Sequence, residues 1–249
     1  MVLTVARIPY LHAEPFYIDM ERRGFELVEM VPSAIAHAAA QGEIDAGLFS
    51  LVDSFRLETH FEPVANFGIA CLRAAGSIFL YAKKPITALG GARIGMTDEA
   101  STAPRLLEIL LRLKYKVQPA TYVARQEPHD GFVLIGNQAL RQRHGARGFP
   151  YTYDLGEEWY TWTQLPLVFS RWMVRKDVDP KVKALLQDTL YVGLEEGVNA
   201  MYQIQEPRDR LLMLPRDITQ YIQGLRFYLR RPEEQSIAQF RQYLKQLGS

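Results

Sequence analysis

Cysteine is nearly absent from this sequence, because Cys71 is the single one among 249 residues. An intrachain disulfide is therefore excluded, and so is a zinc site built from several thiolates. Long hydrophobic runs are absent too, since no apolar stretch reaches the roughly 18 residues that a membrane-spanning helix needs. Residues 1–7 lack the basic and apolar regions of a secretory signal. We therefore expect a cytoplasmic protein that does not bind a membrane.

The chain has no excess of charge of either sign. It contains 29 Lys and Arg residues against 28 Asp and Glu residues, which gives a formal net charge of +1. A nucleic-acid-binding protein would need a clear basic excess, so we expect no nucleic-acid partner. Hydrophobic residues make up 48% of the chain, an ordinary value for a globular protein, and at roughly 150 residues per domain the length predicts one or two domains.

Common cofactor and nucleophile motifs are also missing. The sequence contains neither the phosphate-binding loop G-x-x-x-x-G-K-[ST] nor the nucleophile elbow G-x-S-x-G. His12 and Glu14 form the H-x-E of zinc deaminases, but the P-C-x-x-C that must accompany it needs two cysteines. The five histidines show no spacing typical of metal ligands. We expect no nucleotide cofactor and no metal.

Short apolar runs alternate with amphipathic helical runs along the first part of the chain. Residues 3–8, 25–31 and 44–51 are predicted strands, and residues 14–22 are a predicted helix. Pro32 and Ser33 begin a second helix, with Ser33 as its N-cap, and Gly42 ends it. This β-α-β-α-β order predicts a parallel sheet with right-handed crossovers.

A second α/β set follows, and then a mostly helical C-terminal part. Strands are predicted at 78–82, 92–96, 120–123, 132–135 and 167–174, and helices at 101–114, 137–143 and 156–162. No linker separates the two sets, which favours two lobes that share a cleft. We expect lobe 1 to comprise residues 1–82 and 175–249, and lobe 2 residues 83–174. Ligands in such folds lie at the carboxyl ends of strands and at helix N-termini.

Several segments, taken in order, resemble one family, the chorismate dehydratases of the futalosine route to menaquinone. The most specific is Y-D-L-G-E-E-W at 153–159. The others are R-I-P-Y-L at 7–11, P-S at 32–33, G-E-I-D-A-G-L-F-S at 42–50, G-S-I-F-L at 76–80, T-D-E-A-S-T at 97–102, L-I-G at 134–136, W-T at 162–163 and L-P-L-V-F at 165–169. The similarity extends from about residue 5 to residue 180.

The resemblance implies a fold and a reaction. The fold is that of the two-lobed periplasmic binding proteins of type II, an α/β architecture with parallel-based sheets, a hinge and a central cleft. The reaction removes water from chorismate to give 3-[(1-carboxyvinyl)oxy]benzoate, without a cofactor. The enolpyruvyl carboxylate of the substrate takes the proton, so the protein supplies orientation and anion binding.

The resemblance also implies two catalytic residues. A serine of the family corresponds to Ser77. An asparagine in a Tyr-Leu-Asn segment corresponds to His12, which follows Tyr10 and Leu11. A neutral histidine offers one donor and one acceptor, and it can also act as a base. Glu14 would repel an anionic substrate unless its side chain points away from the cleft.

Five further polar residues are candidates for substrate binding, and each also has a purely structural interpretation. Ser101 and Thr102 begin a helix whose N-terminus could anchor a carboxylate, although they could simply cap it. Asn137 could cap the helix after the strand at 132–135 or face the cleft. The candidates are Ser33, Ser50, Ser101, Thr102 and Asn137.

Other residues near the specific motif have structural interpretations. We expect Asp154 to cap the helix at 156–162, and Trp159 and Trp162 to pack against a lobe. Glu157 and Glu158 are adjacent on that helix, point to different faces and do not form a catalytic pair.

The leading hypothesis is a chorismate dehydratase, a lyase that binds a small anionic carboxylate between two lobes. One alternative is a solute-binding-like protein that carries a small carboxylate without chemistry. Another is a sister lyase with a changed substrate, in which His12 acts as the base. A homodimer is possible under all three.

Overall fold

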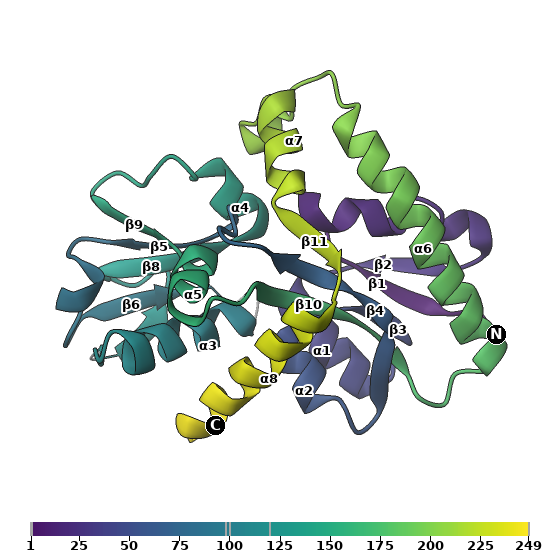
Figure 1. Cartoon of the computed structure of the whole chain (residues 1–249), viewed down its shortest axis with the longest axis horizontal. Helices are drawn as coiled ribbons and strands as arrows, with labels where there is room; N and C mark the ends of the chain where they lie inside the picture. Colours follow the sequence, from purple (N-terminus) through teal and green to yellow (C-terminus); the bar gives the residue numbers. More distant parts are fainter. Residues whose placement is uncertain (1, 98, 100, 120, 249) are drawn as a thin grey trace.

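Six strands form the first of two mixed sheets (Figure 1). The computed structural model describes residues 2–97, 99, 101–119 and 121–248. The strand order is β11-β4-β10-β3-β1-β2. The strands are β1 (Thr4–Arg7), β2 (Glu26–Glu29), β3 (Ala46–Ser50), β4 (Phe61–Cys71), β10 (Leu167–Arg175) and β11 (Leu225–Tyr228). β1 runs parallel to β2 and β3, as predicted, whereas β10 is antiparallel to β3 and β4.

The second sheet has five strands in the order β7-β6-β8-β5-β9. They are β5 (Ile78–Ala82), β6 (Arg93–Met96), β7 (Thr121–Ala124), β8 (Gly131–Ile135) and β9 (Tyr151–Asp154). β6 is parallel to β7 and β8, and β5 is antiparallel to β8 and β9. The predicted strand at 120–123 includes residue 120, which lies outside the described residues, as do residues 98 and 100 of the segment 97–102.

The chain passes between the sheets at two places. β4 of the first sheet leads into β5 of the second, and the return comes between β9 and β10. The strand at 78–82 therefore lies in the second sheet, and the strand at 167–175 in the first. The lobe boundaries expected after residues 82 and 174 assign both strands to the wrong sheet, because an apolar run does not reveal its pairing partner.

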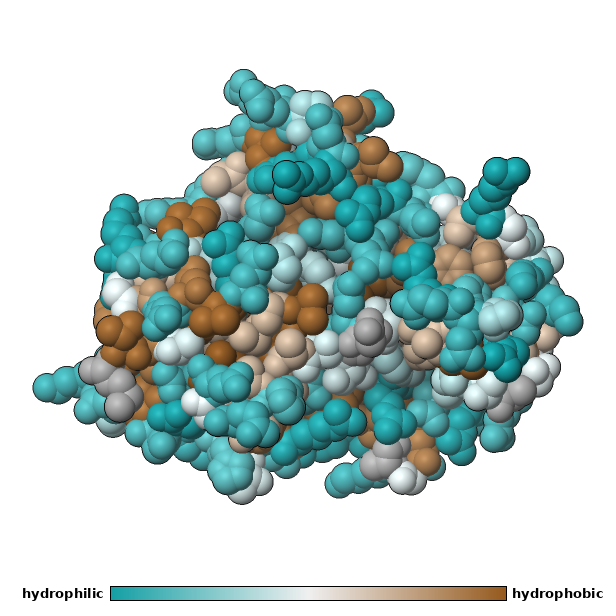
Figure 2. Space-filling model, turned by 180° about the vertical axis from the view of Figure 1, so that it is seen from behind, coloured by the Kyte–Doolittle hydropathy of each residue, from teal (hydrophilic) through white to brown (hydrophobic). Residues whose placement is uncertain are grey.

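Eight α-helices surround the sheets in the described part of the chain. They are α1 (Pro32–Gln41), α2 (Leu51–Arg56), α3 (Thr102–Ile109), α4 (Gly136–Arg141), α5 (Leu155–Thr163), α6 (Pro180–Tyr202), α7 (Pro215–Gln223) and α8 (Arg231–Gln246). None of the helices in the described ranges is both long and apolar enough to cross a membrane. Figure 2 shows a face with mostly hydrophilic side chains and separate hydrophobic patches.

Some elements differ from the sequence-based prediction. The segment predicted as a helix at 14–22 forms two 3₁₀ helices, η1 (Leu11–Tyr17) and η2 (Glu21–Arg23), and Pro15 inside η1 has no N–H to donate. β4, β9 and β11 were not predicted. β4 contains Pro63 and a residue with positive φ, Ala65 at 46°, and its pairing with β10 is interrupted by register shifts. These irregularities conceal its strand pattern.

Helix α8 crosses from the first lobe to α5 of the second (Figure 1). Trp159 is fully buried, and its indole N–H donates to the hydroxyl oxygen of Ser236 over 3.1 Å. Trp162 stacks on Tyr243 with ring centroids 4.7 Å apart. The packing role predicted for the two tryptophans is confirmed, and one hydrophobic core extends through both lobes.

Candidate functional site

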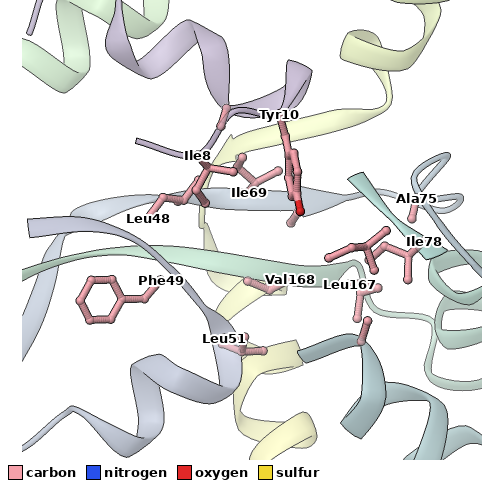
Figure 3. Close-up of a cluster of buried hydrophobic side chains, with 14 of the residues drawn as sticks. Ile8, Tyr10, Leu48, Phe49, Leu51, Ile69, Ala75, Ile78, Leu167 and Val168 are labelled. Carbon is pink, nitrogen blue, oxygen red and sulfur yellow. The ribbon is translucent and has the colours of Figure 1, made fainter. Parts of the chain in front are cut away.

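A small cavity of about 60 Å³ lies between the two sheets, with residues of both lobes around it. Its apolar wall is partly visible in Figure 3, where Ile8 and Leu48 lie on one side of the Tyr10 ring and Ile78 on the other. Pockets for small metabolites usually have about 300–1,000 Å³. The cavity is therefore too small for a metabolite in this arrangement of the lobes, and a wider separation of the lobes would be needed to admit one. The lining residues are Ile8, Tyr10, His12, Pro32, Leu48, Ser50, Ser77, Ile78, Thr102, Ala103, Ile135, Gly136, Phe169 and Ser170.

A chain of hydrogen bonds joins the two predicted catalytic residues through a third side chain. Nδ1 of His12 lies 2.9 Å from the hydroxyl oxygen of Tyr221, and that hydroxyl donates to Oγ of Ser77 over 2.9 Å. Ser77 Oγ in turn lies 3.4 Å from the carbonyl oxygen of Ala75, to which it donates. His12 comes from η1, Ser77 immediately precedes β5, and Tyr221 comes from α7.

Burial controls the protonation of this chain. It lowers the pKa of His12 to about 4, so the imidazole is neutral near pH 7. Burial also raises the pKa of Tyr221, which keeps the phenol protonated. A neutral imidazole, a phenol and a serine hydroxyl can all donate and accept, so the chain can hold or move a proton without carrying a net charge.

Asp154 fixes the loop that carries Ser77. Its carboxylate accepts from the backbone N–H groups of Ala75 at 2.8 Å and Gly76 at 2.6 Å. It also accepts from the N–H groups of residues 156 and 157 and so caps α5, as predicted. Burial raises the pKa of Asp154, and the four N–H groups act against this rise. One side chain therefore joins the start of α5 to the loop before Ser77.

Two groups of polar side chains hold the lobes together beside the cavity. In the first, Oδ2 of Asp53 accepts from Oγ of Ser50 at 2.7 Å and from Oγ of Ser101 at 2.8 Å. The N–H of Val52 also donates to Oγ1 of Thr102 over 3.2 Å. Ser50 caps α2. Ser101 is at the N-cap position of α3 but makes no capping bond, so that prediction is wrong, because its hydroxyl is bonded to Asp53 instead.

The second group surrounds Tyr10. Oδ1 of Asn137 accepts from the N–H of Leu11 over 3.2 Å, and Nδ2 donates to the carbonyl of Pro9 over 2.9 Å. The hydroxyl of Tyr10 donates to Oε2 of Glu99 over 2.5 Å. Of the two interpretations given for Asn137, the helix cap is wrong, because the N-cap of α4 is Ile135 and the amide instead reaches across to the other lobe.

Ser33, a candidate for substrate binding, and Glu14 both lie away from the cavity. Ser33 is the second residue of α1, whose N-cap is Val31, so the capping prediction for Ser33 is wrong. Glu14 does not line the cavity and forms an ion pair with Arg208 at 3.2 Å. Burial raises the pKa of Glu14, and the neighbouring guanidinium opposes that rise. The carboxylate of Glu14 is therefore turned away from the site.

The structure brings together only part of the predicted set. His12, Ser50, Ser77 and Thr102 line the cavity, whereas Ser33, Ser101 and Asn137 do not. The sequence reasoning missed four polar or aromatic members of the site, for which the signal was weak: Tyr10, Phe169, Ser170 and Tyr221. Tyr221 has a hydroxyl in an otherwise apolar helical stripe, and that hydroxyl was the one available indication.

The cavity is mainly apolar, with a few hydroxyl groups among its lining residues. The described residues that line the cavity include no Lys and no Arg. An anion there would meet hydroxyl groups and the first two N–H groups of α3, those of Thr102 and Ala103, which precede the first bond within that helix. Within the described ranges, no group of three or more His, Cys, Asp or Glu side chains is arranged to hold a metal ion.

Comparison with known proteins agrees with this architecture. The periplasmic aliphatic sulphonate-binding protein of Escherichia coli superposes with a TM-score of 0.59 at 14% identity, with 99% of this chain and 93% of that chain covered. A structural genomics target from Archaeoglobus fulgidus superposes with a TM-score of 0.71 at 16% identity, covering 99% and 97%. The chain thus has the fold of the periplasmic binding proteins.

Sequence comparison identifies the family. Chorismate dehydratase of Thermus thermophilus is 25% identical over 256 aligned residues, which cover 94% of this chain and 92% of that protein. The family model described as menaquinone biosynthesis matches residues 3–246. Since that match covers almost the whole chain, this protein belongs to the menaquinone biosynthesis family.

Proposed function

We propose that the protein is a lyase that eliminates water from chorismate to give 3-[(1-carboxyvinyl)oxy]benzoate. One observation carries the proposal: His12 and Ser77 line the same cavity and are joined through Tyr221. The similarity to the chorismate dehydratase of Thermus thermophilus supports it. Ser50 and Thr102 also line this cavity, and we propose their hydroxyls as substrate-binding groups.

The cavity suits a ring that carries carboxylates. Ile8, Leu48 and Ile78 would contact the ring, and the N–H groups at the start of α3 would bind one carboxylate. A second carboxylate that is removed from water and has no cation beside it becomes more basic. The absence of Lys and Arg from the described lining therefore favours a substrate carboxylate as the base.

The proposed elimination balances without a cofactor. The enolpyruvyl carboxylate takes a proton from a ring carbon and passes it to the adjacent ring hydroxyl, which leaves as water while the ring becomes aromatic. The protein contributes orientation and the exclusion of bulk water, both of which lower the barrier of an intramolecular proton transfer. His12, neutral because it is buried, would accept a hydrogen bond from the departing hydroxyl.

Incubation with chorismate tests the proposal directly. Chromatography should show loss of chorismate and appearance of the benzoate product. Ser77→Ala should lower the turnover at least about a hundredfold, the usual cost of removing one polar group that stabilises a transition state. Ser236→Ala is the matched control, since Ser236 lies on α8 and bonds to Trp159, and it should retain turnover.

The same experiment distinguishes the alternatives. His12 stands where the family has asparagine, and this observation favours a sister lyase if chorismate is not converted. Stoichiometric binding of chorismate without product would instead indicate a carrier. Either result from folded protein would overturn the proposed reaction.

A further inference from the structure

Tyr221 lies between His12 and Ser77, the two side chains that the family resemblance assigns to catalysis, and its hydroxyl contacts both. Its hydroxyl lies 2.9 Å from Nδ1 of His12 and 2.9 Å from Oγ of Ser77. The side chain is buried, and its ring lies against Gly76, where an added Cβ would be 3.2 Å from Cδ2 of Tyr221. The position of the phenol is therefore fixed by packing as well as by its two hydrogen bonds.

The end of the hydrogen-bond chain determines its direction. The carbonyl oxygen of Ala75 can only accept, so Ser77 donates to it over 3.4 Å. Ser77 has a single hydroxyl proton, so once that proton is donated to Ala75 its Oγ accepts from Tyr221. The hydroxyl proton of Tyr221 is therefore donated to Ser77, and the hydroxyl oxygen of Tyr221 must accept a hydrogen bond from Nδ1 of His12. The imidazole therefore carries its proton on Nδ1.

We propose that Tyr221 is a positioning residue that holds His12 in the tautomer protonated at Nδ1, so that Nε2 is an unprotonated acceptor at the cavity. His12 lines the cavity, and its remaining ring contacts are to Tyr10 and Phe169, which line it too. Within the described part of the chain, Nε2 has no hydrogen-bond partner. The catalytic consequence of this assignment rests on the proposed function, but the tautomer itself does not.

The tautomer can be measured without substrate. Long-range ¹H–¹⁵N correlation spectra of the whole protein, labelled with ¹⁵N in histidine, distinguish a protonated Nδ1 from a protonated Nε2. We expect His12 of the wild-type protein to be protonated at Nδ1 at pH 7, and His12→Asn assigns the signal. A proton on Nε2 in the wild-type protein would overturn the inference.

Variants test whether Tyr221 is the cause. Tyr221→Phe removes the acceptor for the Nδ1 proton, so His12 should change to the Nε2 tautomer. Ser77→Ala provides a second route, because a Tyr221 hydroxyl without its acceptor would turn and donate to Nδ1. Tyr228→Phe is the matched control: the hydroxyl of Tyr228 is buried on β11 without a partner in the described structure, and its loss should leave the tautomer unchanged. An Nδ1 tautomer that persists in both Tyr221→Phe and Ser77→Ala would contradict the role of Tyr221.

Steady-state kinetics connect the tautomer to catalysis. In Tyr221→Phe we expect kcat to fall about ten- to a hundredfold while KM changes less than about threefold, because binding groups remain and the orientation of the acceptor is lost. If wild-type protein does not convert chorismate, the proposed function fails, and the tautomer is still decided by the spectra. If Tyr221→Phe changes the tautomer but keeps full kcat, the positioning role fails and the proposed function stands.

Discussion

The pH dependence of stability offers a quantitative test of the buried histidine. Burial lowers the pKa of His12 to about 4 in the folded protein, against 6.5 for an exposed imidazole. Between these two values the unfolded chain binds a proton that the folded chain does not bind. The free energy of unfolding must therefore decrease as the pH falls through this range, and it is unaffected by His12 at higher pH.

The two pKa values give the size of the effect. His12 should contribute a loss of about 2 kcal/mol between pH 7.5 and pH 5, which approaches about 3 kcal/mol below pH 4. No charged side chain contributes to the pKa shift, and the ring neighbours of His12 are aromatic side chains. The loss is therefore attributable to the removal of the imidazole from water.

His12→Asn removes the titrating group and introduces the asparagine that the family resemblance implies at this position. Urea unfolding can be followed by tryptophan fluorescence at pH 7.5 and pH 5. Relative to the wild type, the free energy of unfolding of the variant should be about 2 kcal/mol higher at pH 5 than at pH 7.5. His37→Asn, which changes an exposed histidine of α1, should keep a constant difference from the wild type. An equal gap between His12→Asn and the wild type at both pH values would refute the reasoning, since His12 would then be able to bind its proton in the folded state.

Three other substitutions test the scaffold of the site, each by urea unfolding together with turnover. Asp154→Ala leaves four backbone N–H groups without their acceptor and should cost at least about 2 kcal/mol, with lower turnover because the loop before Ser77 is released. Gly76→Ala should cost about 1–2 kcal/mol, since φ is +66° and the new Cβ would press on Tyr221. Asn137→Ala removes two bonds between the lobes and should cost about 1–3 kcal/mol. For Asp154→Ala or Asn137→Ala, stability equal to that of the wild type would show that the removed bonds contribute nothing to the folded state; for Gly76→Ala it would show that position 76 accepts a side chain without strain.

The elements that could be predicted are those with a recognisable pattern in their own local sequence. β1, β3 and α1 follow from alternating apolar runs and from Gly42, which ends α1 with a positive φ of 75°. β4 could not be predicted because Pro63 and the left-handed Ala65 interrupt its pattern. The sheet to which β5 and β10 belong could not be predicted either, because strand pairing depends on distant residues.

The residues of the candidate site also differ in how far the sequence could identify them. Strand ends and the family resemblance identified His12 and Ser77, which each lie beside a recognisable strand. Tyr221 is 209 residues from His12 and 144 from Ser77, so no local signal could connect the three. For Ser101 the local signal was misleading. Its hydroxyl at the start of α3 suggested a helix cap or an anion site, but it donates instead to the carboxylate of Asp53, which is 48 residues away. Short-range rules identify which groups are available, and tertiary contacts decide which of them remain free.

A histidine at position 12, where the family resemblance implies an asparagine, affects how a substrate could lie in the cavity. An asparagine can present both a donor and an acceptor to a ligand, whereas a histidine that donates Nδ1–H to Tyr221 presents only the lone pair of Nε2. That lone pair repels a carboxylate and attracts a hydroxyl. A carboxylate would therefore bind at the start of α3, beside Thr102, and a ring hydroxyl would lie beside His12. The hydroxyl that leaves in the proposed elimination would then face the one fixed acceptor of the site.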